Sequence, residues 1–324
     1  MPAPAKVAAI DIGTNSVLLV IAAAEAGGPR PLLERATITR LGEGVDKTRR
    51  LAPAAVERNL ACLRAYAEDL RAHGAPPLDV VGTSALRDAQ GADAFLNEAE
   101  RILGVRPRVI AGDEEARLTF RGAVSGLELS GKLLVFDVGG GSTELILGDA
   151  AADQGKAGGA PKAAPPPESR VSLDIGSVRL FERHVHGDPP TADEIANLEA
   201  HIARELASAA PLARAAAGEA ITLVGVAGTV TTLKALELGL ARYEASLVHG
   251  AVLTLSTVET LCKELSALSL AERKQLPGLE PKRADVIVAG AFIVRDLLRG
   301  ARASQLVVSD RGVRFGLLEG LISA

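Results

Sequence analysis

The 324-residue sequence has no tryptophan, and aromatic residues make up only 2% of it. Proteins that bind single-stranded nucleic acid stack bases on aromatic side chains, so this scarcity argues against that function. The formal net charge of −4 argues the same way, because broad nucleic-acid binding needs an excess of lysine and arginine to neutralise phosphates. We therefore expect no nucleic-acid partner.

Long apolar runs and a cysteine framework are missing too. The apolar runs are far shorter than the roughly 18 residues that a membrane span needs, and the N-terminal segment MPAPAKVAAI has no signal-peptide core. Cys62 and Cys262 both lie in helical-looking segments and are too few for a disulfide framework. These absences predict a cytoplasmic protein with two reduced core cysteines and no membrane partner.

The residues that are present describe an ordinary globular protein. Hydrophobic residues make up 48% and charged residues 23%, and the length suffices for about two domains. The apolar periodicity predicts the order strand, strand, strand, helix, strand, helix twice, first from KVAAIDIG and again from KLLVFDVG. The elements expected along the way include helices over 53–73, 92–103, 113–124 and 191–209 and a strand over 170–180.

The two copies can be superimposed residue by residue. Asp11 then falls on Asp137, Gly13 on Gly139 and Ser16 on Ser142, and the apolar run 19–21 falls on the apolar run 145–147. One position differs in kind, because Leu18 of the first copy corresponds to Glu144 of the second. A purely structural repeat would keep an apolar residue there, so the carboxylate indicates that one copy is specialised.

The repeat also divides the chain. We expect a first domain over residues 1–127 and a second over 128–311, with the last helix, 312–324, packing back on the first domain. The segment 150–168 is rich in Gly, Ala, Pro and Lys, a composition typical of a flexible loop.

Each copy places an aspartate at the end of an apolar strand, followed by a turn rich in Gly, Ser, Thr and Asn. Such turns leave backbone N–H groups that can cradle phosphate oxygens. An aspartate beside phosphates requires a cation between them, and Mg²⁺ accepts one or two carboxylates together with phosphate oxygens. Two matched copies in one chain favour a phosphate site over two ordinary hairpins. The candidate phosphate-binding residues are Gly13, Thr14, Asn15, Ser16, Gly139, Gly140, Gly141, Ser142 and Thr143.

Other segments admit two interpretations. The acidic start of the helix at 113–124 satisfies the helix dipole, but one of its carboxylates could also activate a water molecule. Arg87 and Arg117 are either surface residues or phosphate ligands, and the basic run 47–50 is either a solvated loop or a polyanion contact. The segment 223–236 is similar to the adenosine-contacting segment of actin-like ATPases, or is a helix capped by Thr229. His249 stays unassigned.

The combination of DIGTNS, EEAR and DVGGGSTE resembles the exopolyphosphatase and guanosine pentaphosphate phosphohydrolase family, Ppx/GppA, in its short two-domain form. The stretches VVGTSALRDA, VAGTVTTLKAL, LVHGAVL, RADVIVAGAFIV and VSDRGVRFGLLEG follow in the family's order, so the resemblance covers nearly the whole chain. It implies a duplicated actin-like (ribonuclease H-like) α/β fold, whose two domains flank a cleft, and a homodimer. Two departures are VLLV after DIGTNS and Phe315, where members usually have an acidic residue.

The resemblance also assigns residues. It makes Glu115 the catalytic carboxylate, places Asp11, Asp137 and Glu144 at the acidic positions around Mg²⁺ or Mn²⁺, and makes Arg87 a phosphate ligand. The implied reaction is attack by water on the terminal phosphate of polyphosphate or guanosine pentaphosphate. Two other functions remain open, an ATP-dependent kinase or ATPase of the same fold and a non-catalytic sensor of a phosphorylated alarmone.

Overall fold

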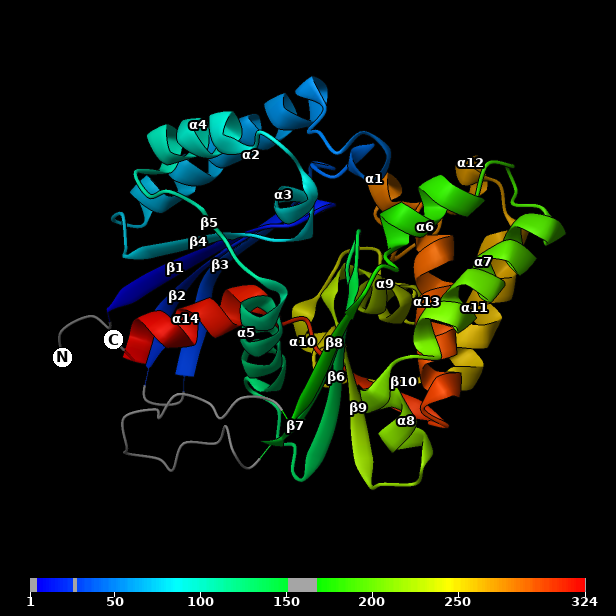
Figure 1. The fold of residues 1–324 in the computed structure, drawn as a ribbon. Coiled ribbons are helices and arrows are strands. Elements are labelled where there is room, and N and C mark those ends of the chain that lie inside the picture. Colours follow the sequence, from blue (N-terminus) through cyan, green and yellow to red (C-terminus); the bar gives the residue numbers. More distant parts are fainter. Residues whose placement is uncertain (1–4, 26–27, 151–167, 324) are drawn as a thin grey trace. The chain divides into compact units, whose positions relative to one another are not determined.

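The computed structural model describes residues 5–25, 28–150 and 168–323, which form two compact units (Figure 1). Unit 1 comprises residues 5–126 and 312–323, and unit 2 comprises 127–150 and 168–311. Almost all of the loop expected at 150–168 lies outside the described residues. In the part of the chain that is described, no helix combines the length and apolar character that crossing a bilayer requires.

Unit 1 is built on a five-stranded sheet with the order β3-β2-β1-β4-β5. The first three strands form an antiparallel meander, and β4 and β5 continue the sheet in parallel with β1. Its strands are β1 (Lys6–Ile12), β2 (Ser16–Glu25), β3 (Gly28–Ile38), β4 (Leu78–Gly82) and β5 (Arg108–Val109). Its helices are α1 (Val45–Thr48), α2 (Pro53–Ala72), α3 (Ser84–Asp88), α4 (Asp93–Leu103), α5 (Gly112–Val124) and α14 (Val313–Ser323).

Both faces of this sheet are covered by helices, as Figure 1 shows. Successive side chains of a strand point to opposite faces, so each strand serves two cores. Ala8 and Ile10 of β1 pack in the core formed with α2 and α4, whereas Val7 and Ala9 pack with α14. Strands buried on both faces read as continuous apolar runs, which explains the pattern KVAAIDI.

The contact between α5 and α14 depends on glycine. A Cβ atom on Gly122 would collide with the carbonyl oxygen of Gly312, and one on Gly316 would collide with that of Leu118. The ion pair between Arg121 Nε and Glu319 Oε2, 2.6 Å apart, joins the same two helices. The C-terminal helix is therefore an integral part of unit 1.

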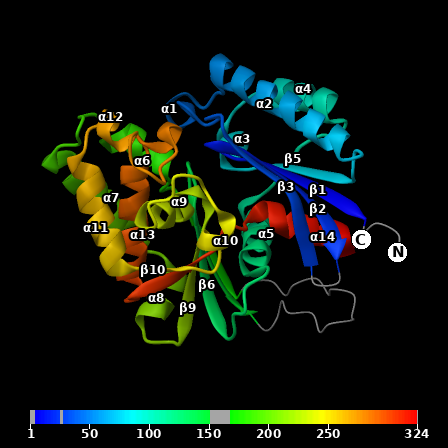
Figure 2. The same ribbon diagram turned by 180° about the vertical axis from the view of Figure 1, so that it is seen from behind.

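Unit 2 repeats the strand order of unit 1. Its six-stranded sheet has the order β10-β11-β9-β6-β7-β8, so β8-β7-β6-β9-β11 corresponds to β3-β2-β1-β4-β5, and β10 is an added antiparallel edge strand that Figure 2 shows near α10. This arrangement confirms the predicted α/β class and the actin-like duplication. The strands are β6 (Lys132–Val138), β7 (Thr143–Asp149), β8 (Ser169–Leu173), β9 (Ile221–Val226), β10 (Val252–Thr254) and β11 (Gln305–Val308).

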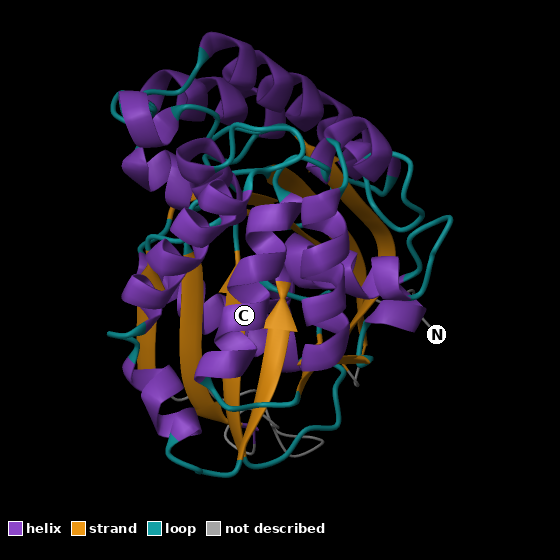
Figure 3. Ribbon diagram, turned by 90° about the vertical axis from the view of Figure 1, so that its right-hand side faces the viewer, coloured by secondary structure: helices purple, strands orange, loops and turns teal. Residues whose placement is uncertain are grey.

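Helices pack on the sheet of unit 2 around one large apolar core (Figure 3). Helix α13 is its centre, since nearly all of its residues are buried. Cys262 lies in this core and Cys62 in that of unit 1, and both thiols are free, in agreement with the prediction. The helices are α6 (Ser177–His184), α7 (Ala192–Leu206), α8 (Ala210–Ala216), α9 (Ala227–Glu237), α10 (Ala245–Val248), α11 (Leu255–Ala267), α12 (Leu270–Arg273) and α13 (Ile287–Gly300), with a 3₁₀ turn over Pro281–Arg283.

Two predicted elements of unit 2 are wrong in part. The strand expected over 170–180 ends at Leu173, and Ser177 begins helix α6, because the first amides of that helix donate to carbonyls of the loop 139–141. The helix expected over 191–209 ends at Leu206. The separate helix α8 begins at Ala210, and Pro211 lies in its first turn, because proline lacks the amide needed to continue a preceding helix.

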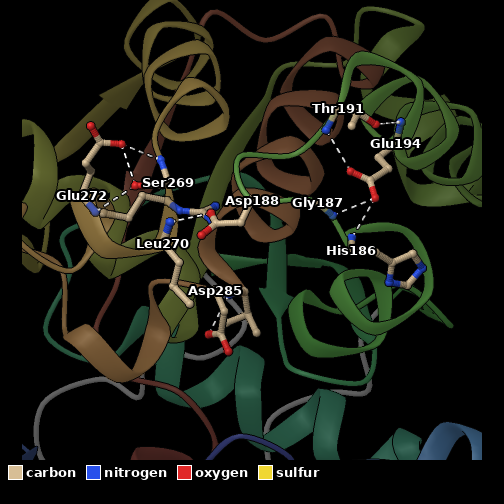
Figure 4. A network of polar contacts seen from close by, with 11 residues as sticks. His186, Gly187, Asp188, Thr191, Glu194, Ser269, Leu270, Glu272 and Asp285 are labelled. Carbon is tan, nitrogen blue, oxygen red and sulfur yellow. Dashed lines mark hydrogen bonds and ion pairs between the residues drawn. The ribbon is translucent and has the colours of Figure 1, made fainter.

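The connection between α6 and α7 is held by carboxylates (Figure 4). Glu194 accepts from the backbone amides of Thr191, at 2.8 Å, and of His186 and Gly187, at 2.9 Å. These bonds lower the pKa of Glu194 to about 2. Asp188 accepts from the amide of Leu270 at 2.6 Å, which ties this connection to α12.

The glycine contact of α5 and α14 yields a first prediction. Gly122→Ala should lower the free energy of unfolding by about 2 kcal/mol or more, because the new methyl group must displace backbone of α14. Urea unfolding followed by circular dichroism measures the change. Gly320→Ala is the matched control, since no atom lies near a Cβ at that position. Equal stability of the two variants would contradict the tight crossing.

Candidate active site

The predicted site residues lie where parallel strands end. In unit 1 these are the carboxyl ends of β1, β4 and β5, and in unit 2 those of β6, β9 and β11. Ligands bind at this edge of α/β sheets because the connecting loops and helix starts present their free amides there. Each unit thus carries its own set of candidate residues at this edge of its sheet, which we call its half-site.

The turns after β1 and β6 have the same geometry. The amide of Gly13 donates to the carbonyl of Ser16 at 2.9 Å, and that of Gly139 donates to Ser142 at 3.0 Å. A Cβ on either glycine would lie 3.0 or 3.1 Å from the same carbonyl oxygen, which is a crowded contact. The residue-by-residue superposition of the two copies therefore holds at the level of individual hydrogen bonds.

Each turn leaves amides available. The N–H groups of Thr14 and Asn15, and those of Gly140 and Gly141, donate to no backbone carbonyl within the described residues. In unit 1 the turn is fixed through its carbonyls instead, since Thr14 O accepts from Gly42 and Asn15 O accepts from Arg40. Consecutive free amides over a fixed turn form a nest that suits an anion. We refer to residues 13–15 and 139–141 as the two cradle loops.

The second cradle loop is supported from behind by α6. The amides of Ser177, Val178 and Arg179 donate to the carbonyls of Gly139 and Gly140 at 2.9 to 3.0 Å. The buried side chain of Arg179 donates from Nε to Gly141 O at 2.5 Å. Gly176 must be glycine, because a Cβ there would overlap the Gly140 carbonyl. With its carbonyls engaged by α6, the loop has its amides left for a ligand.

The candidate carboxylates occupy equivalent positions in the strand pairing of the two hairpins. Asp137 lies directly opposite Glu144 on the β6–β7 hairpin, and Asp11 lies opposite Leu18 on β1–β2. Side chains directly opposite each other share one face of a sheet, so Asp137 and Glu144 form a carboxylate pair. Glu144 is buried and accepts from Ser172 Oγ at 2.9 Å. The position that breaks the sequence repeat is therefore the position that completes an acidic pair in unit 2.

Asp11 is the exceptional carboxylate of unit 1. Its Oδ1 atom is buried and has no hydrogen-bond partner among the described residues. Burial raises the pKa of Asp11 to about 7, and the positive charge of Arg314 opposes part of that rise. A buried carboxylate oxygen without a partner is costly unless a ligand or cation satisfies it.

These carboxylates fit a hard divalent cation. Magnesium prefers oxygen ligands and keeps several positions for water and substrate phosphates, so one or two protein carboxylates suffice. Asp137 and Glu144 supply two, and the orphan oxygen of Asp11 supplies another donor in unit 1. A complete protein cage is not present, since no three His, Cys, Asp or Glu residues gather around one point within the described ranges.

Arg87 and Glu115 meet in unit 1. Arg87 is on α3, whose preceding Thr83 amide bonds to Ile12 O at the end of β1, and Glu115 is in the first turn of α5. The two side chains form a close ion pair, and Arg87 Nη1 also donates to Ile110 O at 3.1 Å. Glu115 is only 7% exposed. Glu115 and Arg87, which the sequence resemblance assigned to different roles, therefore form one ion pair beside the first cradle loop.

Sequence reasoning missed Arg283. Its guanidinium lies directly on the backbone at Gly228, where a Cβ would overlap its Nη1 and Cζ atoms. Gly228 is in the first turn of α9, next to Thr229, whose Oγ1 donates to Val138 O at 3.1 Å beside the second cradle loop. An arginine held at that helix start adds a positive charge to the half-site of unit 2. The RAD motif contained the residue, but its position emerges only from the fold.

Three remaining residues can now be placed. Thr229 does not cap α9, because the helix begins at Ala227 and Val226 occupies the cap position, so that interpretation is wrong. Phe315 belongs to α14 and is fully buried in the core between this helix and the first sheet. His249 pairs through Nδ1 with Asp310 at 3.2 Å, and its buried Nε2 has no hydrogen-bond partner within the described part of the chain.

Comparison with known proteins is consistent along the chain. A model of the Ppx/GppA phosphatase family matches residues 20–323. Exopolyphosphatase 2 of Mycobacterium tuberculosis is 38% identical over 327 residues, which cover 96% of this chain and 97% of that protein. The guanosine-5'-triphosphate,3'-diphosphate pyrophosphatase of Aeromonas salmonicida is 31% identical over 97% of this chain, but the match spans 59% of its own length.

A solved structure shares the fold. The crystal structure of the Aquifex aeolicus member of the Ppx/GppA family is 32% identical, covers 98% of this chain and 97% of its own, and superimposes with a TM-score of 0.77.

The support of the second cradle loop yields a second prediction. Gly176→Ala should weaken binding of inorganic pyrophosphate by about tenfold or more, because the methyl group displaces Gly140 and with it the free amides. Isothermal titration calorimetry measures the affinity, and circular dichroism checks that the fold persists. Gly320→Ala, which crowds nothing, should bind as the parent does. Unchanged affinity in the Gly176 variant would remove the loop from the binding site.

Proposed function

Because this chain belongs to the Ppx/GppA phosphatase family, we propose that it hydrolyses the terminal phosphoanhydride bond of a linear phosphate chain and releases orthophosphate. The observation that carries the proposal is the ion pair that the partly exposed Arg87 makes with the buried Glu115 beside a cradle loop. A kinase would need a second acceptor site, and no observation in the described residues favours one. A sensor would have no use for a buried carboxylate at such a site.

The cradle loops have the role of binding phosphate. Their free amides donate to phosphate oxygens, and glycine allows the backbone to approach without a Cβ in between. Arg283 adds positive charge on the side of unit 2. Hydrolysis of phosphoanhydrides depends mainly on positioning and electrostatic stabilisation, and these groups supply both.

Glu115 has the role of general base. Its carboxylate orients a water molecule and accepts its proton as the water oxygen bonds to the terminal phosphorus. The bond from that phosphorus to the bridging oxygen breaks, and the shortened chain leaves with the oxygen. Arg87 holds Glu115 through a guanidinium that Ile110 O fixes in turn, so the carboxylate is pre-oriented.

A divalent cation completes the proposed site. Asp137 and Glu144 are the residues of unit 2 that would hold Mg²⁺ or Mn²⁺, and Asp11 is the candidate metal ligand of unit 1. When bound, the cation neutralises phosphate oxygens that these carboxylates would otherwise repel. Ser172 orients Glu144 by donating to its Oε1.

Inorganic polyphosphate is the substrate we propose first. The relative named exopolyphosphatase aligns with this chain over nearly its full length, whereas the relative named for a guanosine substrate is much longer than the matched region. Guanosine pentaphosphate presents the same terminal bond and is the second candidate. Release of phosphate from both substrates, measured side by side, decides between them.

Glu115 can be tested against its neighbour. Glu115→Gln should lower kcat on polyphosphate by roughly a hundredfold to ten-thousandfold, the range for loss of a general base, with a smaller change in KM. Glu114→Gln is the control, because Glu114 occupies the same helical turn but pairs with Arg108 at 2.7 Å on the surface. Phosphate release gives both rates. Near-parental turnover by the Glu115 variant would exclude it as the base.

The acidic pair of unit 2 can be tested through metal dependence. Chelation should abolish phosphate release and added Mg²⁺ should restore it. Glu144→Gln should raise the Mg²⁺ concentration for half-maximal rate by about tenfold or more. Asp149→Asn, at the opposite end of the same hairpin, should leave that concentration unchanged. If both variants respond to Mg²⁺ like the parent, Glu144 is not a ligand.

A further inference from the structure

Three neighbouring cations of unit 1 have no partner within the described part of the chain. Lys47, Arg49 and Arg50 are exposed, and their side chains make no ion pair or hydrogen bond with any described residue. Most other arginines of this unit are paired, as Arg58 is with Glu43 at 2.5 Å and Arg108 is with Asp79 at 3.0 Å. Three unpaired positive charges within residues 47–50 attract anions.

The loop that carries these cations is held in one conformation. Arg49 has φ of 55°, in the left-handed region that residues other than glycine rarely adopt. Its carbonyl accepts from the Gln90 amide at 2.8 Å, and its amide bonds to Val45 O at 2.9 Å. Thr48 Oγ1 donates to Gly44 O at 2.9 Å and accepts from the Arg50 amide at 3.2 Å. Strained backbone that is fixed on several sides is typical of functional loops.

The same segment begins on the first cradle loop. Arg40 N and Gly42 N donate to the carbonyls of Asn15 and Thr14. Gly42 is pressed against the side chain of Thr14, where a Cβ would collide. Residues 39–50 therefore run from the cradle loop to the three cations within unit 1. A linear anion that is bound at the first cradle loop and extends along this segment would therefore contact the three cations.

Arg50 also lines a hollow of about 530 Å³. Its walls are mainly apolar and include Leu51, Val56, Leu60 and Phe95, with Gln90 at the side. The hollow therefore lies directly beside the basic loop.

We propose that Lys47, Arg49 and Arg50 form a second phosphate site, which binds inner phosphates of a linear polyphosphate whose end lies at the cradle loop. The proposal rests on the polyphosphatase function proposed above and extends it to chain length. Long chains contact both sites, whereas tripolyphosphate is too short to leave the first. The basic loop therefore raises affinity for long chains and leaves the reacting end unchanged.

The test replaces all three cations, as Lys47→Gln, Arg49→Gln and Arg50→Gln in one variant. The control, Arg204→Gln, Lys263→Gln and Lys274→Gln, removes the same charge from exposed side chains of unit 2 that also have no partner within the described residues. Binding of long-chain polyphosphate and of tripolyphosphate is measured without divalent ions, and hydrolysis of both is measured with Mg²⁺. Thermal unfolding checks that both variants fold.

The loop variant should bind long chains about tenfold more weakly and keep its affinity for tripolyphosphate within about twofold, with a shallower salt dependence. The control should bind both as the parent does. Equal losses for both chain lengths, equal losses in the control, or no loss would overturn the proposal. If the parent hydrolyses no polyphosphate, the proposed function fails, while the binding comparison still decides whether the second site exists.

Discussion

Both half-sites depend on one short hydrogen bond, from the amide of Gly13 to Ser16 O and from the amide of Gly139 to Ser142 O. This bond reverses the chain over so few residues that the intervening amides cannot bond within the turn. Their carbonyls are taken up elsewhere, by Arg40 and Gly42 in unit 1 and by α6 in unit 2. The turn is thus rigid and has a surplus of donors, which is the property that a phosphate site needs.

Charge is distributed unevenly around these turns. In unit 1 Arg87 and the buried Glu115 compensate each other's charge, so the pair adds little net field but fixes the orientation of the carboxylate. Asp137 and Glu144 are like charges placed opposite each other, an arrangement that is unfavourable until a cation joins them. In the complex proposed above, a bound cation would relieve this repulsion.

The sequence predicted the repeated part of this architecture well, because the matched strands and turns obey local rules. Asp11 and Asp137 could be superimposed by counting residues, and the strand orders agree. What sequence reasoning missed depends on tertiary contacts. Ser177 starts a helix only because the loop 139–141 accepts its amide, and Arg283 reaches Gly228 only through the fold. The roles of Glu115 and Arg87 came from resemblance, and their pairing could not be read from sequence.

The crossing of α5 and α14 has a consequence for biosynthesis. Arg121 and Glu319 are separated by 198 positions, and nearly all of unit 2 lies between them. During translation the first sheet leaves the ribosome while the helix that covers one of its faces has not yet been made. Val20 and Val81 stay without their helix partner until α14 is synthesised. Because unit 2 is synthesised before α14, it can complete its core before unit 1 does.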